Sequence, residues 1–334
     1  MNQQKIMKFK YFLLLVSIIV GSQSIKSQSF NNYKWETLTC KGQPVARHEA
    51  AFIEANGKFY LVGGRRIQEV SIFNPKTNTW TSGAKPPIEL HHFEGFSYKG
   101  EIYTVGVQTG GYPHEKSLSE NYKYQPKTNQ WVRTFDMPTG RVRASTSANV
   151  YKDKLYIACG IIDGHWDGHV KWFDVYDFKT KKWDTLPDAP RYRDHACSVI
   201  SNDKLYLIGG RVTSASIGKV FQLTEPLVDV YDFKTKSWST LENPILTQRA
   251  GCTAIAIGDK IILAGGESVK QKTAHNEVEC LDTKTGKWST LPPLQVGRHG
   301  SQLIWYKKKL YIASGCSSMG GNSELTSIEC FKKK

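Results

Sequence analysis

Histidine and tyrosine side chains that can transfer protons interrupt an otherwise regular sequence at a few places. All nine histidines lie in irregular segments between short stretches typical of β-strands. A neutral imidazole takes up a proton near neutral pH, and imidazole or phenol can return one to a leaving oxygen. Residues that break a regular pattern are better functional candidates than residues that recur in it. The expected acid–base residues are His92 and His114 as a pair, with His195, Tyr112 and His165 as substitutes.

Arginine follows the same distribution as histidine. Ten of the eleven arginines lie in the same irregular segments, and only Arg133 lies elsewhere. A guanidinium group binds a planar carboxylate or sulfate through two parallel hydrogen bonds. An aromatic face beside it favours a sugar ring as the bound group. The expected substrate-binding residues are Arg193, Arg211, Arg65, Trp166 and His169.

The elements that position these residues form an internal repeat, in which tryptophans recur at separations of 45 to 55 residues. Five of these tryptophans each end a similar turn: NPKTNTW, QPKTNQW, FKTKKW, FKTKSW and TKTGKW. Upstream of each turn lies a strand that ends in glycine, such as KFYLVGG or KLYLIGG. Each unit therefore predicts four short strands, a to d. The tryptophans are Trp35, Trp80, Trp131, Trp183, Trp238 and Trp288.

This pattern resembles the kelch repeat, and it covers essentially all of residues 30–334. The resemblance implies an all-β fold, a six-bladed β-propeller that forms one domain. The last unit lacks strand d, whereas a lone strand d at about residues 33–38 precedes the first unit. We expect this N-terminal strand to complete the last blade and close the ring, which leaves no exposed sheet edge.

The repeat also separates structural residues from functional ones. An arginine precedes strand a in five units (Arg47, Arg143, Arg193, Arg249 and Arg298), so we expect this position mainly to hold the blade together. In a four-stranded blade the b–c and d–a connections open on one face, and the histidines and arginines fall on that face. Most lysines occupy the short hairpins of the opposite face. Variable loops on a rigid scaffold are where function usually lies.

Imidazoles, arginines and aromatic rings on one face favour an acidic carbohydrate as partner. An arginine neutralises a uronic carboxylate, and His or Tyr removes the neighbouring proton and protonates the departing oxygen. We therefore expect β-elimination by a lyase or dehydratase, similar in site chemistry to propeller polysaccharide lyases. The repeat itself is similar to exported bacterial kelch proteins that interconvert sialic acid anomers. Such an isomerase, and a non-catalytic glycan- or protein-binding module, are the alternatives.

Composition and motifs limit the remaining possibilities. No nucleotide-binding loop, HExxH motif or CxxC pair occurs, and we expect no cofactor, metal or nucleic acid, and a monomer. The apolar run from Tyr11 to Gly21 is too short for a membrane span and follows three lysines, which predicts a signal peptide over residues 1–29. We therefore expect export to the periplasm or the medium. The formal charge of +15 falls to about +11 without the four lysines of that segment.

Overall fold

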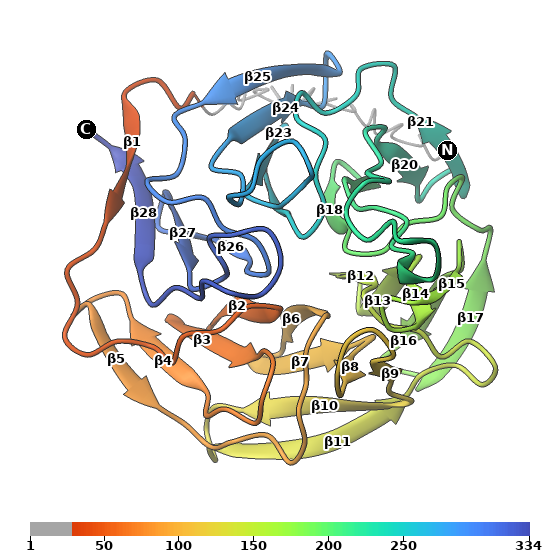
Figure 1. The fold of residues 1–334 in the computed structure, drawn as a ribbon, viewed down its shortest axis with the longest axis horizontal. Coiled ribbons are helices and arrows are strands. Elements are labelled where there is room, and N and C mark those ends of the chain that lie inside the picture. The colour runs from red at the N-terminus through yellow and green to blue at the C-terminus, as the bar shows by residue number, and fades with distance from the viewer. Residues whose placement is uncertain (1–28) are drawn as a thin grey trace, which may run out of the picture.

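The computed structural model describes residues 29–334, which form six four-stranded antiparallel sheets around a central axis (Figure 1). In five of the six sheets the strands follow one another in chain order from the axis outward, as expected for a kelch propeller. The all-β fold and the repeat architecture predicted from the sequence are therefore confirmed. The predicted signal peptide lies, except for its last residue, outside the described residues.

The strands of the six blades have the following bounds. Blade 1 comprises β2 (Ala50–Ala55), β3 (Lys58–Gly63), β4 (Ser71–Asn74) and β5 (Thr79–Ser82). Blade 2 comprises β6 (Glu94–Tyr98), β7 (Glu101–Val105), β10 (Glu120–Gln125) and β11 (Gln130–Asp136). Blade 3 comprises β12 (Ser147–Tyr151), β13 (Lys154–Ala158), β16 (Phe173–Asp177) and β17 (Lys182–Leu186). Blade 4 comprises β18 (Cys197–Ser201), β19 (Lys204–Ile208), β20 (Asp229–Asp232) and β21 (Ser237–Thr240). Blade 5 comprises β22 (Thr253–Ile257), β23 (Lys260–Ala264), β24 (Val278–Asp282) and β25 (Lys287–Leu291).

Blade 6 is completed by the N-terminal strand. Its strands β26 (Leu303–Tyr306), β27 (Lys309–Ala313) and β28 (Ile328–Lys333) are followed on the outside by β1 (Tyr33–Thr37). β1 runs antiparallel to β28, with Trp35 opposite Phe331 and their ring centroids 5.0 Å apart. The closure predicted for residues 33–38 is therefore present, one residue shorter than expected.

The recurring arginines hold five of the six blades together. They are almost fully buried, and in four blades the guanidinium pairs with a carboxylate of the third strand. A buried charge is stable only when it is paired and hydrogen-bonded, and these side chains also donate to loop carbonyls. The pairs are Arg143–Asp174, Arg193–Asp229, Arg249–Glu279 and Arg298–Glu329.

Two residues after each of the five arginines, and after Leu90 at the same place in blade 2, the backbone forms a closed ring around the axis. The six residues have φ between 50° and 64°, in the left-handed region. Successive members are linked by N–H···O=C bonds of 2.9 to 3.3 Å, and Ala50 N donates to Gly300 O to close the ring. Left-handed backbone strains side chains other than glycine and often occurs at functional sites. The ring consists of Glu49, His92, Ser145, His195, Gly251 and Gly300.

A small extra sheet, which the sequence analysis did not predict, joins the loops of blades 2 and 3. It contains β8 (Gln108–Thr109), β9 (Lys116–Ser117), β14 (Ile161–Asp163) and β15 (Asp167–His169), side by side in Figure 1. Asp163 is paired with Lys116 across the two loops. A single 3₁₀ turn, Ala215–Ile217, lies in the blade 4 loop. Within residues 29–334 no helix has the length and apolar character needed to cross a membrane.

Candidate functional site

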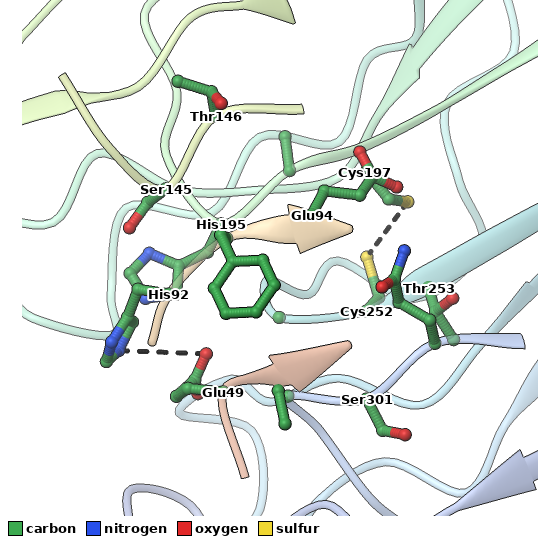
Figure 2. A pocket seen from close by; sticks show the side chains of 16 residues that line it. Glu49, His92, Glu94, Ser145, Thr146, His195, Cys197, Cys252, Thr253 and Ser301 are labelled. Carbon is green, nitrogen blue, oxygen red and sulfur yellow. Dashed lines mark hydrogen bonds and ion pairs between the residues drawn. The ribbon is translucent and has the colours of Figure 1, made fainter. Parts of the chain in front are cut away.

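A cavity of about 230 Å³ opens at the centre of the loop face. Every blade contributes to its lining, so it lies on the propeller axis above the ring. A narrower cavity below it runs between the first strands of the blades, where Glu49, His92 and His195 lie together (Figure 2). The upper cavity is lined by His48, Glu49, Arg65, His92, Tyr112, His165, Arg211, Val220, Phe221, Glu267, His299, Gly320 and Gly321.

Three buried imidazoles meet at the floor of this cavity. The ring centroids of His92 and His165 are 4.9 Å apart, those of His92 and His195 5.1 Å, and those of His165 and His195 5.3 Å. His92 and His195 belong to the left-handed ring, whereas His165 is placed by the small sheet. One nitrogen of each ring lies within 4.8 Å of the others. We call these three residues the histidine cluster.

The second nitrogen of each imidazole in the cluster has its own partner. His165 Nδ1 lies 2.9 Å from Glu115 Oε1, and His195 Nδ1 contacts Asp194 Oδ1. His92 Nδ1 lies 2.6 Å from the Nδ1 of His91. Burial lowers the pKa of His92 well below its usual value, and burial together with Arg211 lowers that of His195. Both rings are therefore neutral at pH 7.

The carboxylates behind the cluster are buried and ionised. Burial alone would raise the pKa of Glu115, but the hydrogen bond with His165 and the neighbouring Arg65 bring it to about 2. Burial likewise opposes ionisation of Asp194, whose pKa is nevertheless held well below normal by His195 and His169. Asp194 also accepts hydrogen bonds from the backbone N–H and the hydroxyl of Thr213.

Opposite the cluster, His299 lies between two carboxylates. Its Nδ1 is 3.3 Å from Glu49 Oε1 and its Nε2 is 3.5 Å from Glu267 Oε2. Burial lowers its pKa, but the attraction of Glu267 and Glu49 outweighs burial and raises that pKa well above the usual value. Arg211 pairs with Glu267 at 2.6 Å. We call His299, Glu49, Glu267 and Arg211 the charged network.

Three further side chains form the rim of the cavity. His48 Nδ1 lies 2.8 Å from Glu324 Oε1, and its other nitrogen has no hydrogen-bond partner among residues 29–334. The guanidinium of Arg65 donates to Glu115 at 2.7 Å and remains one quarter exposed. Tyr112 is 58% exposed, and its ring centroid lies 5.5 Å from that of His165.

The structure brings most of the predicted site residues to the cavity, but it does not form the predicted His92–His114 pair. His92, His165, Tyr112, Arg65 and Arg211 line it, and His195 adjoins it. His114 is exposed, 3.1 Å from Asp163, and its ring lies 4.7 Å from Trp166. Both rings stand outside the lining of the cavity, on the outer part of the small sheet.

Two other predicted binding residues serve internal contacts. Arg193 is buried against Asp229 inside blade 4, so the geometry gives no support to its predicted contact with a carboxylate. His169 Nε2 lies 2.9 Å from Asp194 Oδ2, which makes it a support for His195 and not part of the lining. Arg211 lines the cavity, but only 2% of its surface is exposed and its charge is already paired.

Sequence reasoning missed His48, Glu49, Glu267 and His299. The signal was present in the repeat, because these residues lie one or two positions after the recurring arginine or directly after the glycine pair. In five blades the residue directly after the recurring arginine position forms an isolated antiparallel bridge with the residue directly after the glycine pair. His299 with Cys316 is one example. An alignment of the six units at these positions would have placed all four at the axis.

Comparison with known proteins agrees with the fold. A model described as the KLHDC2/KLHL20/DRC7 Kelch-repeats domain matches residues 96–315, and a Kelch motif matches residues 46–87. The solved chain titled "Structure of YjhT" superposes with a TM-score of 0.72 at 19% identity, covering 87% of this chain and 96% of that one. This likeness concerns the fold alone.

Curated relatives are longer than the region they share with this chain. The Kelch-like protein terF of Aspergillus terreus is 29% identical over 84% of this chain and 64% of its own length. Kelch-like protein 40 of Xenopus laevis is 28% identical over 64% of this chain and 34% of its own length. The chain thus spans from one third to just under two thirds of these relatives. Taken with the closed ring of six blades, the match over residues 96–315 shows that the chain belongs to the kelch-repeat family.

Proposed function

We propose that this protein is an enzyme that acts on acidic carbohydrate in the cavity of the loop face. One observation carries the proposal. A single cavity on the axis combines a buried histidine cluster, a partly exposed guanidinium and an exposed phenol. Buried imidazoles that line a cavity are costly to desolvate, and such groups cluster at functional sites.

The proposed reaction is β-elimination next to a uronic carboxylate. His48, oriented by Glu324, removes the proton on the carbon that bears the carboxylate. The electron pair of that C–H bond forms the new C=C bond, and the bond from the neighbouring carbon to its oxygen breaks. Tyr112 then gives its phenolic proton to the departing oxygen. The acid and the base belong to neighbouring blades and line the same cavity.

Removal of this proton is feasible only if the charge that develops on the carboxylate is stabilised. Arg65 is the arginine of the lining that keeps exposed surface, so it is the proposed direct contact. Arg211 is held by Glu267 and acts on the cavity through its charge. The carboxylate of the substrate then points toward the histidine cluster at the floor.

The test is incubation of purified protein with oligosaccharides of different uronic acids. The unsaturated product is followed by its ultraviolet absorbance. We expect product with the wild type and a decrease of ~10²–10⁴-fold in turnover for His48→Gln and Tyr112→Phe. Tyr192→Phe is the matched control, because Tyr192 is similarly exposed but lies outside the cavity. Circular dichroism checks that each variant is folded.

Two results would replace this proposal. Exchange between anomers of an acidic sugar, seen by proton NMR without unsaturated product, would indicate a mutarotase-like isomerase. Saturable binding of an acidic sugar without either reaction would indicate a non-catalytic glycan-binding module. In both cases the same variants at His48 and Tyr112 show whether the cavity is the site.

A further inference from the structure

We propose that the histidine cluster binds one divalent transition-metal ion through the Nε2 atoms of His92, His165 and His195. The site lies at the floor of the cavity, with a coordination position open toward the cavity. No sequence motif predicts it, because the ligands come from three blades and their spacing of 73 and 30 residues matches no metal-binding pattern.

The three imidazoles already converge as metal ligands do. One nitrogen of each lies within 4.8 Å of the others, and all three side chains are buried. An ion at the usual ~2.0–2.1 Å from each nitrogen needs the rings to move inward by less than ~1 Å. Within residues 29–334 this is the one group of His, Cys, Asp or Glu side chains that meets this geometry.

A carboxylate lies behind each of two rings. His195 Nδ1 donates to Asp194 Oδ1, and His165 Nδ1 lies 2.9 Å from Glu115 Oε1 without the geometry of a hydrogen bond. Both contacts favour the tautomer whose lone pair is on Nε2. Metal-bound histidines almost always have such a carboxylate or carbonyl partner on their other nitrogen.

The tautomer of His92 follows from its neighbour His91. His91 Nε2 donates a hydrogen bond of 3.1 Å to Gly110 O, so the proton of the neutral ring is on Nε2. The Nδ1 of His91 then accepts a hydrogen bond of 2.6 Å from the Nδ1 of His92. The Nε2 of His92, 3.8 Å from Glu49 Oε2, keeps its lone pair in this tautomer.

Three lone pairs that face one another in a buried site favour a bound cation. Within residues 29–334, the buried Nε2 of His195 has no hydrogen-bond partner, a cost that a bound ion would remove. The surrounding charges point the same way, because four ionised carboxylates face three cations. The carboxylates are Glu49, Glu115, Asp194 and Glu267, and the cations are Arg65, Arg211 and His299.

Imidazole ligands suit Zn²⁺, Cu²⁺, Ni²⁺ and Fe²⁺ and not Mg²⁺ or Ca²⁺. Three protein ligands with one open position are typical of a catalytic site and not of a structural one. If the proposed function holds, the open position takes the carboxylate of the substrate, which supplies the charge stabilisation that Arg211 cannot give directly. This role of the ion in binding the substrate depends on the proposed function, whereas binding of the ion itself does not.

The experiment measures metal binding without substrate. Protein stripped with a chelator is titrated with Zn²⁺ by calorimetry and with Co²⁺ by visible absorbance. We expect about one equivalent, with the visible bands of a four- or five-coordinate Co²⁺ site, and a loss of at least ~100-fold in affinity for His165→Gln. Asp194→Asn and Glu115→Gln should weaken binding by ~10–100-fold, because they only orient ligands.

His114→Ala is the matched control, since His114 is an exposed histidine on the same small sheet. His165 stands outside the blades, and circular dichroism of the stripped variant shows whether it remains folded. Wild-type affinity in folded His165→Gln and His92→Gln would overturn the proposal, as would the absence of binding to the stripped wild type. Full lyase turnover in stripped protein would leave the reaction standing and overturn the role of the metal in it.

Discussion

His92 and His299 occupy nearly equivalent positions around the same axis, yet the protein gives them opposite charge states. His92 faces two other imidazoles, and burial lowers its pKa well below the usual value. His299 is just as buried, but Glu267 and Glu49 raise its pKa well above that value. The comparison shows that burial alone does not decide the protonation of a histidine. The neighbours do: His299 has two carboxylates, at 3.3 and 3.5 Å, which offset the cost of desolvation. His92 has one carboxylate, Glu49 at 3.8 Å, and three imidazoles that oppose its protonation.

The difference also assigns the two sides of the floor to different tasks. On the side of His299 the charges are paired, and Glu49 joins the two sides because its Oε2 also lies 3.8 Å from His92 Nε2. On the side of His92, the buried Nε2 of His195 has no hydrogen-bond partner among the described residues. The charged network therefore stabilises the fold, and the histidine cluster is available for a ligand.

The largest difference in the free energy of unfolding is expected between removal of the His299 imidazole and removal of the His92 imidazole. His299→Gln leaves Glu49 and Glu267 buried without their shared cation, and loss of one partner of a buried ion pair costs ~3–5 kcal/mol. His92→Gln removes a neutral ring and should cost less than ~2 kcal/mol. Urea denaturation of chelator-treated protein measures both free energies of unfolding.

A double variant sharpens this result. If the loss in His299→Gln comes from the buried carboxylates, Glu49→Gln should restore ~1–3 kcal/mol in the His299→Gln background. The same Glu49→Gln change in the wild-type background should destabilise the protein. Equal effects of Glu49→Gln in both backgrounds would show that the two side chains are not coupled.

Above neutral pH, the dependence of the free energy of unfolding on pH should come from His299. Its folded pKa lies above its unfolded value of ~6.5, so its contribution is complete below pH ~6.5 and disappears as pH rises through the folded pKa. Loss of one proton corresponds to ~1.4 kcal/mol per pH unit. The free energy of unfolding of the wild type, measured against pH above neutrality, should show this slope, and His299→Gln should lack it.

Below pH ~6.5, the dependence of the free energy of unfolding on pH should instead come from the histidine cluster. The pKa values of His92 and His195 are lowered in the folded state, so their contributions are present above pH ~6.5 and decrease as pH falls below it. In stripped protein, His195→Gln should reduce the slope below pH ~6.5 by up to one proton. An unchanged slope would mean that His195 is protonated in the folded protein.

The smallest effect is expected at His114. Its side chain is more than half exposed, and its contact with Asp163 is a surface ion pair. His114→Ala should change the free energy of unfolding by less than ~0.5 kcal/mol at any pH between 5 and 8. A larger loss would show that its contact with Trp166 holds the small sheet in place.

Local signals repeat along the amino-acid sequence, and they are sufficient to predict the propeller. Each NPKTNTW-type turn and each strand ending in glycine defines its own hairpin, and six copies leave one strand, β1, to close the ring. The recurring arginines were likewise expected to be structural. Arg193 pairs with Asp229 as the other blade arginines pair with their carboxylates, so its predicted contact with a substrate gains no support from the geometry.

Which side chains meet at the axis depends on the tertiary structure. The charge states of these side chains depend on it as well. His165 reaches His92 and His195 because the small sheet folds two loops together, and no local pattern specifies that pairing. His114, two residues from Tyr112 in the same loop, is turned away from the cavity. The opposite pKa shifts of His92 and His299 arise from neighbours contributed by other blades. Electrostatic environment depends on distances in space, and those distances exist only after the ring has closed.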